Sequence, residues 1–400
     1  MLHYINAIAV YFKKLYAKKM GYFKNNICFR NYSFIFIESN LLVLLINHMP
    51  LRALKYLLVY ITPLVVFLSI YSENYWSFSA VFMLFVLIPV LELFTKASTK
   101  NLDKIEEEIA KHDKIYDWLL FALVPVQYFL LGYFLCQVSQ DNVPIYYKIG
   151  ASIALGMSCG IIGINAAHEL GHRITWQEQL MSKMLLLTTL YMHFFIEHNR
   201  GHHKNVSTDQ DPASAKLGET VYAFYFRSII GSWLSAWHIE AQQLKKKNAR
   251  FWSIKNEMLV FQIIQALLLI IIGTVFGLNT LLLYFLAALI GILLLESVNY
   301  IEHYGLRRKK TNAGYERTLP IHSWNSNHPV GRLILLELSR HSDHHYMANR
   351  KYQILRHFDE SPQMPTGYPG MLLLALLPPL WFKIMHQRIE CCEQLQISKV

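Results

Sequence analysis

Residues 145–172 of this 400-residue chain read IYYKIGASIALGMSCGIIGINAAHELGH. From Ile145 to Ala167 the stretch carries Lys148 as its one charged residue. It is long enough to cross a bilayer core, which takes about 20 mostly apolar residues. His168 and His172 follow directly, and a helix places residues four apart on one face. The stretch therefore predicts a membrane helix that presents a pair of imidazoles at its end.

Five further stretches have the same length and apolar character. They are Ala53 to Tyr71, Trp76 to Phe94, Trp118 to Val138, Met258 to Phe276 and Thr280 to Tyr300. Short turns, such as residues 72–74 and 277–279, join the six stretches into three hairpins, and long polar segments separate the hairpins. Only helices and closed barrels satisfy all backbone polar groups in lipid, and stretches of this length fit helices. We predict an all-α integral membrane protein with six transmembrane helices.

The composition supports this class. Hydrophobic residues make up 54% of the chain and charged residues 16%, whereas about 25% charged residues is usual in soluble domains. Disorder is excluded by the apolar content, and the five cysteines show no disulfide framework. Small residues of the fourth span are expected to let it pack closely against another helix, and the wall of a substrate channel is the second interpretation. They are Gly156, Gly160, Gly163, Ala166 and Ala167.

Lysine and arginine residues set the expected orientation. They lie before the first span, between spans two and three, between spans four and five, and after span six, while the three hairpin turns carry none. The positive-inside rule then places both termini and the long segments on the cytoplasmic side of a bacterial inner membrane. The net charge of +11 follows from this bias, so no nucleic-acid partner is expected.

The domain organisation is simple. Residues 1–48 form a basic N-terminal arm, for which two interpretations stay open: an interfacial arm, or a start-site artefact with Met49 as the true beginning. Residues 49–386 are predicted to form a single membrane domain. Residues 387–400 form a polar C-terminal tail, in which Cys391 and Cys392 are expected to be ordinary thiols.

Half of the eighteen histidines fall in four clusters near the ends of spans or in the polar segments. The nine are His168, His172, His198, His202, His203, His303, His341, His344 and His345. Spacings of three and four residues predict shared helix faces for His198 with His202, and for the last three. Imidazole suits zinc, copper, iron and nickel, whereas magnesium and calcium prefer oxygen. Since one metal takes about four to six ligands, nine imidazoles indicate two metals.

Several carboxylates accompany the clusters. Glu169, Glu197, Glu302 and Asp343 are expected to accept hydrogen bonds from the outer ring nitrogens of the ligands, with Glu169 and Asp343 the foremost candidates. Glu296 lies inside the sixth span, where a carboxylate is costly and usually functional. We predict that it faces the interior of the helix bundle as a hydrogen-bonding partner near the site.

A zinc protease is the main rival from another class. HELGH matches the H-E-x-x-H pattern, in which two histidines bind zinc and the glutamate is a general base. A protease needs one further ligand, however, and would leave the other clusters without a role. A transporter is not favoured, because the spans carry no polar residue at mid-membrane apart from Glu296.

Taken together, the clusters HELGH (168–172), EHNRGHH (197–203), NYIEHYG (299–305) and HSDHH (341–345) resemble those of a known family. They are similar to the integral-membrane di-iron alkane 1-monooxygenases, within the membrane fatty-acid desaturase and hydroxylase superfamily. NYIEHYG separates that group from ordinary acyl desaturases. The resemblance runs from about Asp117 to Phe382.

The resemblance implies a function. The nine histidines would ligate two non-haem irons in a cytoplasmic helical domain, with His328 as an outer-shell residue. An alkane or similar chain from the bilayer would be hydroxylated by O2 to a primary alcohol. Electrons would come from a separate rubredoxin and its NADH-dependent reductase, because the chain lacks the paired CxxC of a fused rubredoxin. A fatty-acid desaturase or hydroxylase, or an aromatic side-chain monooxygenase, remains open on the same scaffold.

Overall fold

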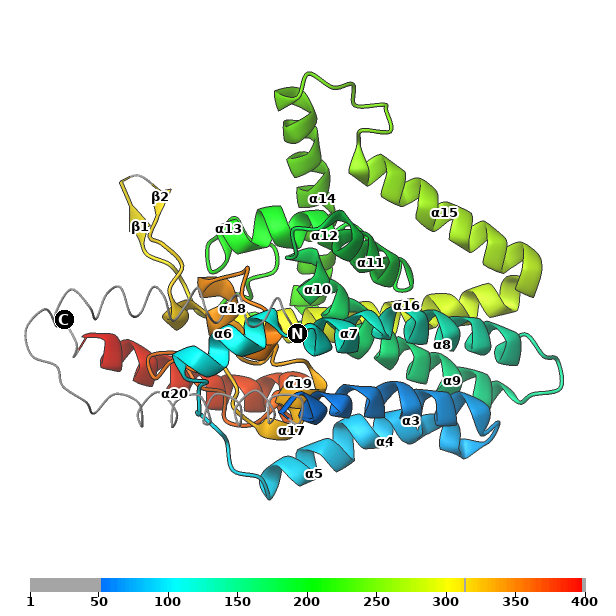
Figure 1. The fold of residues 1–400 in the computed structure, drawn as a ribbon, viewed down its shortest axis with the longest axis horizontal. Coiled ribbons are helices and arrows are strands. Elements are labelled where there is room, and N and C mark those ends of the chain that lie inside the picture. The colour runs from blue at the N-terminus through cyan, green and yellow to red at the C-terminus, as the bar shows by residue number, and fades with distance from the viewer. Residues whose placement is uncertain (1–51, 313, 398–400) are drawn as a thin grey trace, which may run out of the picture. The chain divides into compact units, whose positions relative to one another are not determined.

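The computed structural model describes residues 52–312 and 314–397. The arm predicted for residues 1–48, and the alternative start at Met49, lie outside these residues. Within them the only sheet is a short antiparallel hairpin of β1 (Lys310–Thr311) and β2 (Gly314–Tyr315). The rest of the regular structure is helical, as predicted (Figure 1).

Six helical segments of the described chain are long and apolar enough to cross a membrane, which confirms the predicted spans. The first is η1 (Leu54–Tyr60) with α3 (Ile61–Tyr71), and the second runs through η2 (Tyr75–Phe78), α4 (Ser79–Phe82), η3 (Met83–Leu87) and α5 (Ile88–Leu93). The third is α7 (Lys114–Phe121) with α8 (Leu123–Val138), and the fourth runs through α9 (Ile145–Ser158), η4 (Cys159–Ile164) and α10 (Asn165–Gly171). The fifth is α15 (Glu257–Phe276) and the sixth is α16 (Leu278–His303).

The fourth and sixth spans end later than the apolar pattern indicated. The fourth continues to Gly171 rather than Ala167, and the sixth continues to His303 rather than Tyr300. The apolar runs end earlier because the last turn of each helix carries polar residues that are buried in the protein instead of exposed to lipid. The continuous helices therefore carry the first and third histidine clusters rigidly.

The fourth and sixth spans pack closely at the centre of the bundle, where α9 and η4 run beside α16 (Figure 1). A Cβ added to Gly156 would lie 2.6 Å from the carbonyl oxygen of Ala287, and one on Gly160 would lie 2.9 Å from Leu294 Cβ. Only glycine permits this approach, as expected for small residues between membrane helices. By contrast, only 17% of the apolar window of α15 is buried, against 83% for the fourth span.

An aromatic core fixes the end of α16. Trp324 and Trp381 are fully buried there with Tyr300 and Tyr304. The Trp324 indole Nε1 donates to the Tyr304 carbonyl at 2.9 Å, and the rings of Tyr300 and Trp381 lie 5.1 Å apart. This packing holds the last turn of the sixth span, and hence His303, against the remaining elements.

The remaining helices lie around the ends of the spans. They are α6 (Lys104–His112), α11 (Trp176–Leu187), α12 (Phe194–Glu197), η5 (His198–His202), α13 (His203–Asn205), α14 (Val221–Lys246), η6 (Pro320–His322), α17 (Pro329–Ile334), α18 (His341–Tyr346), η7 (Tyr352–Ile354), α19 (Tyr368–Ala375) and α20 (Pro378–Ile397). Local caps define several starts: Asp103 and Glu106 form a capping box at α6, and Thr220 and Asn256 cap α14 and α15.

Candidate metal centre

The nine histidines of the four clusters converge at one end of the spans. They form a five-histidine group and a four-histidine group, and within each group the candidate ligand atoms all lie within 4.8 Å of one another. The first group is His168, His172, His198, His203 and His344, and the second is His202, His303, His341 and His345. The structure thus brings together every residue predicted as a ligand, in two sets that fit two metals.

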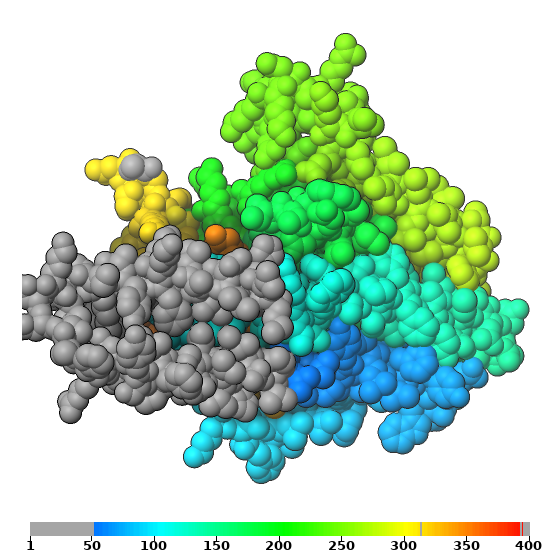
Figure 2. Space-filling view, in the orientation of Figure 1, coloured from blue at the N-terminus to red at the C-terminus, as the bar shows by residue number. Residues whose placement is uncertain are grey.

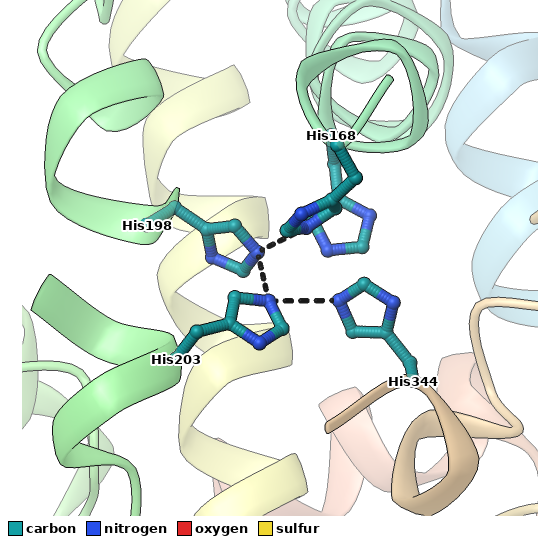
Figure 3. Close-up of side chains that lie close together, drawn as sticks. His168, His198, His203 and His344 are labelled. Carbon is teal, nitrogen blue, oxygen red and sulfur yellow. Dashed lines mark hydrogen bonds between the residues drawn. The ribbon is translucent and has the colours of Figure 1, made fainter. Parts of the chain in front are cut away.

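The five-histidine group is shown in Figure 3. The Nε2 atom of His198 lies 3.2 Å from that of His172 and 3.0 Å from that of His203. The Nε2 atom of His203 lies 3.0 Å from that of His344. The Nε2 atom of His168 is buried and has no hydrogen-bond partner among the described residues. Five ring nitrogens therefore face a common point.

These distances fit metal ligation. Two imidazole nitrogens at right angles around a metal, with bonds of about 2.1 Å, would be about 3.0 Å apart. A ligand must also be unprotonated. Burial, with the neighbouring His202, lowers the pKa of His172 to about 3, and burial lowers the pKa of His198 and His344 well below the usual value. Neutral rings with converging lone pairs suit a divalent transition metal.

The four-histidine group repeats this geometry. The Nε2 atoms of His202 and His345 are 3.2 Å apart, and so are those of His303 and His341. The two groups are adjacent, since the ring of His203 in the first lies 4.5 Å from that of His345 in the second. The structure thus holds two adjacent groups of histidines, each of which could hold a metal ion.

Local helix geometry decides which histidine joins which group. Residues His198–His202 form a π-helical turn, which advances more residues per turn than an α-helix. His203, five residues after His198, joins the same group, while His202 turns to the other group. In α18 likewise, His344 joins the first group and His341 the second. The α-helical spacing predicted that His198 and His202 share a helix face, but the structure assigns them to different groups. This part of the prediction was wrong, because α-helical spacing does not describe the π turn.

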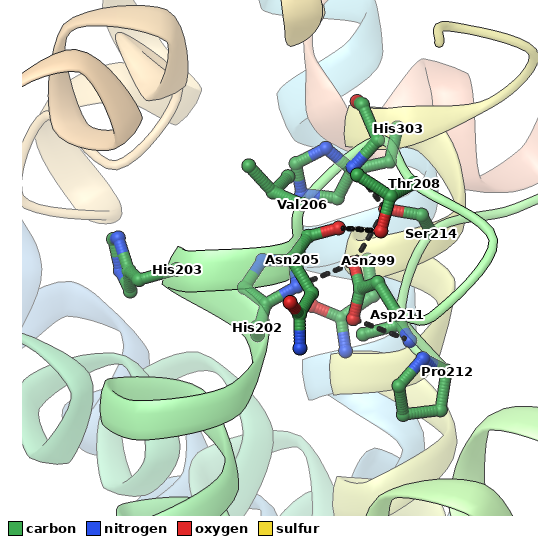
Figure 4. Close-up of polar contacts among 12 residues, drawn as sticks. His202, His203, Asn205, Val206, Thr208, Asp211, Pro212, Ser214, Asn299 and His303 are labelled. Carbon is green, nitrogen blue, oxygen red and sulfur yellow. Dashed lines mark hydrogen bonds and ion pairs between the residues drawn. The ribbon is translucent and has the colours of Figure 1, made fainter. Parts of the chain in front are cut away.

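One carboxylate outside the predicted set orients a ligand. Asp211 lies in the loop before α14, and its Oδ2 atom is 2.9 Å from Nδ1 of His202 (Figure 4). Ser214 Oγ also donates to Asp211, and the backbone N–H of Ala213 donates to its second oxygen. Burial alone would raise the pKa of Asp211, but His202 and the hydrogen bond from Ser214 hold this pKa below its usual value. Asp211 lies nine residues after His202 in the sequence, and this spacing does not predict a contact between them.

Replacing Asp211 tests this role. Asp211→Asn should weaken metal binding at the four-histidine group by roughly 10- to 100-fold, the usual cost of removing such a partner. The metal content of the purified variant, titrated against a chelator, measures the effect. Asp209→Asn is the matched control, because Asp209 lies two residues away and is exposed. Equal chelator resistance of Asp211→Asn and the wild type would contradict the assignment.

Glu169 and Asp343 do not bond to imidazoles among the described residues, so the prediction that they orient the ligands directly was wrong. Glu169 accepts from Arg173 Nη2 at 2.6 Å, and Asp343 accepts from Arg356 Nη2 at 2.9 Å. A guanidinium group forms charge-assisted hydrogen bonds that are stronger than those between neutral groups, and such bonds occupy both carboxylates. The pairing of Glu169 also leaves HELGH without the free general base that a zinc protease requires.

The other predicted carboxylates lie deep in the protein. Glu302 Oε2 is 3.2 Å from His341 Nε2, and Glu302 Oε1 accepts from Tyr368 Oη at 2.6 Å. Glu197 is 3% exposed, and burial, followed by the charge of Asp211, raises its pKa to about 8. Of the two, Glu302 therefore has a direct contact with a candidate ligand.

Glu296 faces the interior as predicted, and it is 1% exposed. It accepts hydrogen bonds from Tyr191 Oη at 2.8 Å, from Ser228 Oγ at 2.5 Å and from Asn299 Nδ2 at 3.3 Å. Glu296 thus joins α14 and the segment before α12 to the sixth span.

His328 belongs to neither histidine group, and its Nδ1 lies 3.1 Å from Ser326 Oγ.

An apolar cavity opens beside the two histidine groups. Its walls include Ile164, Leu294, Val298 and other aliphatic side chains, with Leu84 from the second span. Histidines of both groups contribute to the wall, namely His168, His198 and His341. A long apolar molecule in this cavity would therefore touch the metal-binding end directly.

Comparison with known proteins agrees with the site. The fatty acid desaturase family profile matches residues 144–375. The chain is 42% identical over 308 residues to the alkane 1-monooxygenase of Acinetobacter baylyi, covering 77% of this chain and 75% of that protein. It is 36% identical over 348 residues to alkane 1-monooxygenase 2 of Alcanivorax borkumensis, covering 86% and 91%. It is also 30% identical over 277 residues to the xylene/toluene monooxygenase hydroxylase component of Pseudomonas putida, covering 67% and 72%.

The residues matched by the family profile, 144–375, include the last three spans and all four histidine clusters. The chain belongs to the alkane 1-monooxygenases of the membrane fatty-acid desaturase and hydroxylase superfamily.

Proposed function

We propose that this chain hydroxylates the terminal carbon of an alkane, or of a similar apolar chain, to a primary alcohol with O2. The single observation that carries the proposal is the apolar cavity whose wall includes histidines of both groups. A cavity of this kind binds a molecule without polar handles, and its position brings the bound chain to the metals. The relatives named alkane 1-monooxygenase support the same substrate class.

We infer that the two metals are iron. Two iron ions supply the activation of O2 that an unactivated C–H bond requires, which no side chain can provide. His168, His172, His198, His203 and His344 would hold one ion, and His202, His303, His341 and His345 the other. A structural zinc takes four ligands in a closed shell, so the five-histidine group does not fit that role.

The protein's own contribution is placement. Ile164 and Val298 exclude water from the cavity beside the centre and hold the chain against it. Asp211 fixes the orientation of the His202 ring, and Tyr368 fixes the Glu302 carboxyl beside His341. These contacts keep the ligand set rigid while the substrate is exchanged with the bilayer.

Electrons must come from outside the described chain, and we propose rubredoxin, reduced by an NADH-dependent reductase, as the donor. His172 and His203 are the least buried of the nine histidines, so donor access is easiest at the five-histidine group. The lysine and arginine distribution supports a bacterial inner membrane with this end of the spans in the cytoplasm, where NADH is available.

A second candidate is hydroxylation of an aromatic side chain. It is favoured by one observation, the 30% identity to a xylene/toluene monooxygenase component. An alkylbenzene also presents a methyl group on an apolar molecule, with a weaker C–H bond than that of an alkane, and would fit the same apolar walls.

Product analysis tests the proposal. The purified, iron-loaded full chain, supplied with rubredoxin, its reductase, NADH and O2, should convert an n-alkane to the 1-alcohol. Parallel reactions with a fatty acid and an alkylbenzene rank the alternatives, and an alkene product would indicate a desaturase. Failure to oxidise any of these substrates, with both irons bound, would refute the function.

A further inference from the structure

Helix α14 (Val221–Lys246) runs across the direction of α9 and α16 instead of along it (Figure 1). Since α9 and α16 are membrane spans, a helix at this angle lies close to the membrane plane. It carries a set of large apolar side chains that stay exposed in the part of the chain that the structure describes. They are Tyr222, Phe226, Ile230 and Trp233, with exposed fractions of 39% to 74%.

These side chains share one face of the helix. They recur at steps of three and four residues, the period that places side chains on one side of an α-helix. Another face packs on the protein, where Ser228 donates to Glu296 and Ser235 donates to Glu197. The face of α14 that packs on the protein is mixed, since it buries Phe224 and Ala236 as well as Ser228, and the opposite apolar face is left open.

Residues 247–255 continue this open surface beyond the helix. Trp237 of α14 stacks on Phe251 at 5.8 Å, and Phe251 contacts Trp252 at 5.2 Å. Trp252 is 79% exposed and Ile254 is 91% exposed. Figure 2 shows this part of the chain projecting from the body of the protein, in yellow-green.

Basic residues surround these apolar side chains. They are Lys245, Lys246, Lys247, Arg250 and Lys255, all exposed. None of the five has an ion-pair partner within residues 52–312 and 314–397. The surface thus combines exposed aromatic groups with uncompensated positive charge.

The position of this surface identifies its partner. Asn256 caps α15, so the fifth membrane span begins directly after the basic loop. A segment at the end of a span lies at the level of the lipid headgroups, where tryptophan is enriched and basic residues attract anionic lipids. An in-plane helix with an apolar face buries that face in the same layer.

We propose that α14 and residues 247–255 form a membrane-surface element that binds anionic phospholipid headgroups through its basic residues. The apolar face of α14 and Trp252 insert below the headgroups. The element does not depend on the metal centre or on the reaction proposed above. Because Ser228 and Ser235 lie on the opposite side, lipid binding also positions α14 against Glu296 and Glu197.

Lipid selectivity provides the first test. The full chain is placed in nanodiscs of phosphatidylcholine with a minority of phosphatidylglycerol, and the lipids that it retains are counted by native mass spectrometry. The wild type should enrich phosphatidylglycerol. The triple variant Lys245→Gln, Lys246→Gln, Lys247→Gln should bind it at least about tenfold more weakly, because each basic residue contributes about fivefold at an anionic surface.

A second variant with the same loss of charge distinguishes a specific lipid-binding site from general electrostatic attraction to the membrane. Lys309→Gln, Lys310→Gln, Arg317→Gln removes the same charge from exposed positions on and beside the β1–β2 hairpin. This control should retain the wild-type enrichment. Equal enrichment in all three proteins, or equal loss in both variants, would overturn the proposal. A dimer that the 245–247 variant abolishes would assign the surface to a second copy and would also overturn it.

Insertion depth provides the second test. Trp252→Cys and His238→Cys, each in a cysteine-free background, are labelled with an environment-sensitive fluorophore in nanodiscs that contain nitroxide-labelled acyl chains. His238 is exposed but lines an open cleft with Asp209 and Lys216, so it faces water. Position 252 should be quenched and position 238 should not. Equal quenching at the two positions would refute insertion.

Discussion

His202→Ala should leave the protein with one metal in place of two and abolish alcohol formation. The variant reduces the four-histidine group to three imidazoles, and it leaves the buried carboxylate of Asp211 without its ring partner. An unpaired buried charge is strongly destabilising, so the loss at this site should exceed the loss of a single ligand. Metal analysis of the purified protein, together with the product assay, measures both effects.

His344→Ala is the informative comparison for the other group. It reduces the five-histidine group to four imidazoles, a number that still suffices for a closed metal shell. This variant should therefore retain more metal than His202→Ala while losing activity. His112→Ala, an exposed residue paired with Glu108, should keep both metals and full turnover. Normal turnover by His202→Ala would contradict the assignment of the ligands.

Val298→Phe should lower kcat/KM for a long alkane by at least about tenfold while leaving the metal content unchanged. Val298 lines the cavity from the sixth span, one turn before the segment that carries Glu302 and His303. A larger side chain there would shift the bound chain, and a displacement of about 1 Å at a reacting atom can cost about 100-fold. The comparison of kinetics with metal content separates substrate placement from the metals.

Val298→Leu serves as the graded control. It adds less volume and should reduce the rate by a smaller factor, with the shortest alkanes least affected. Metal loss in Val298→Phe would show that the residue supports the ligands instead of the cavity. An unchanged rate for every chain length would mean that the substrate does not occupy this cavity.

Much of the architecture follows from local composition. A run of about 20 apolar residues is sufficient to define a membrane helix, and all six predicted spans are present within a few residues. The ends of the fourth and sixth spans were placed too early, because His172 and His303 lie near buried polar turns that resemble the start of a loop.

The convergence of the nine candidate ligands was also predictable from the sequence, since clustered imidazoles have few other uses. The hydrogen-bonding partners were not. Asp211 contacts His202 across a loop, and Glu169 and Asp343 turn to Arg173 and Arg356. Proximity in sequence to a histidine proved a poor guide, because a carboxylate bonds the strongest donor within reach in space.

The sequence by itself determined the six spans and the nine imidazoles, because span length and ligand chemistry are properties of individual segments and side chains. The tertiary structure alone decided the division into five and four histidines, the pairing of Asp211 with His202, and the cavity. Each of these depends on contacts between distant elements: α18 delivers His344 to one group and His341 to the other. The π-helical turn at His198–His202 similarly separates two neighbouring rings, since its geometry is set by packing and not by spacing.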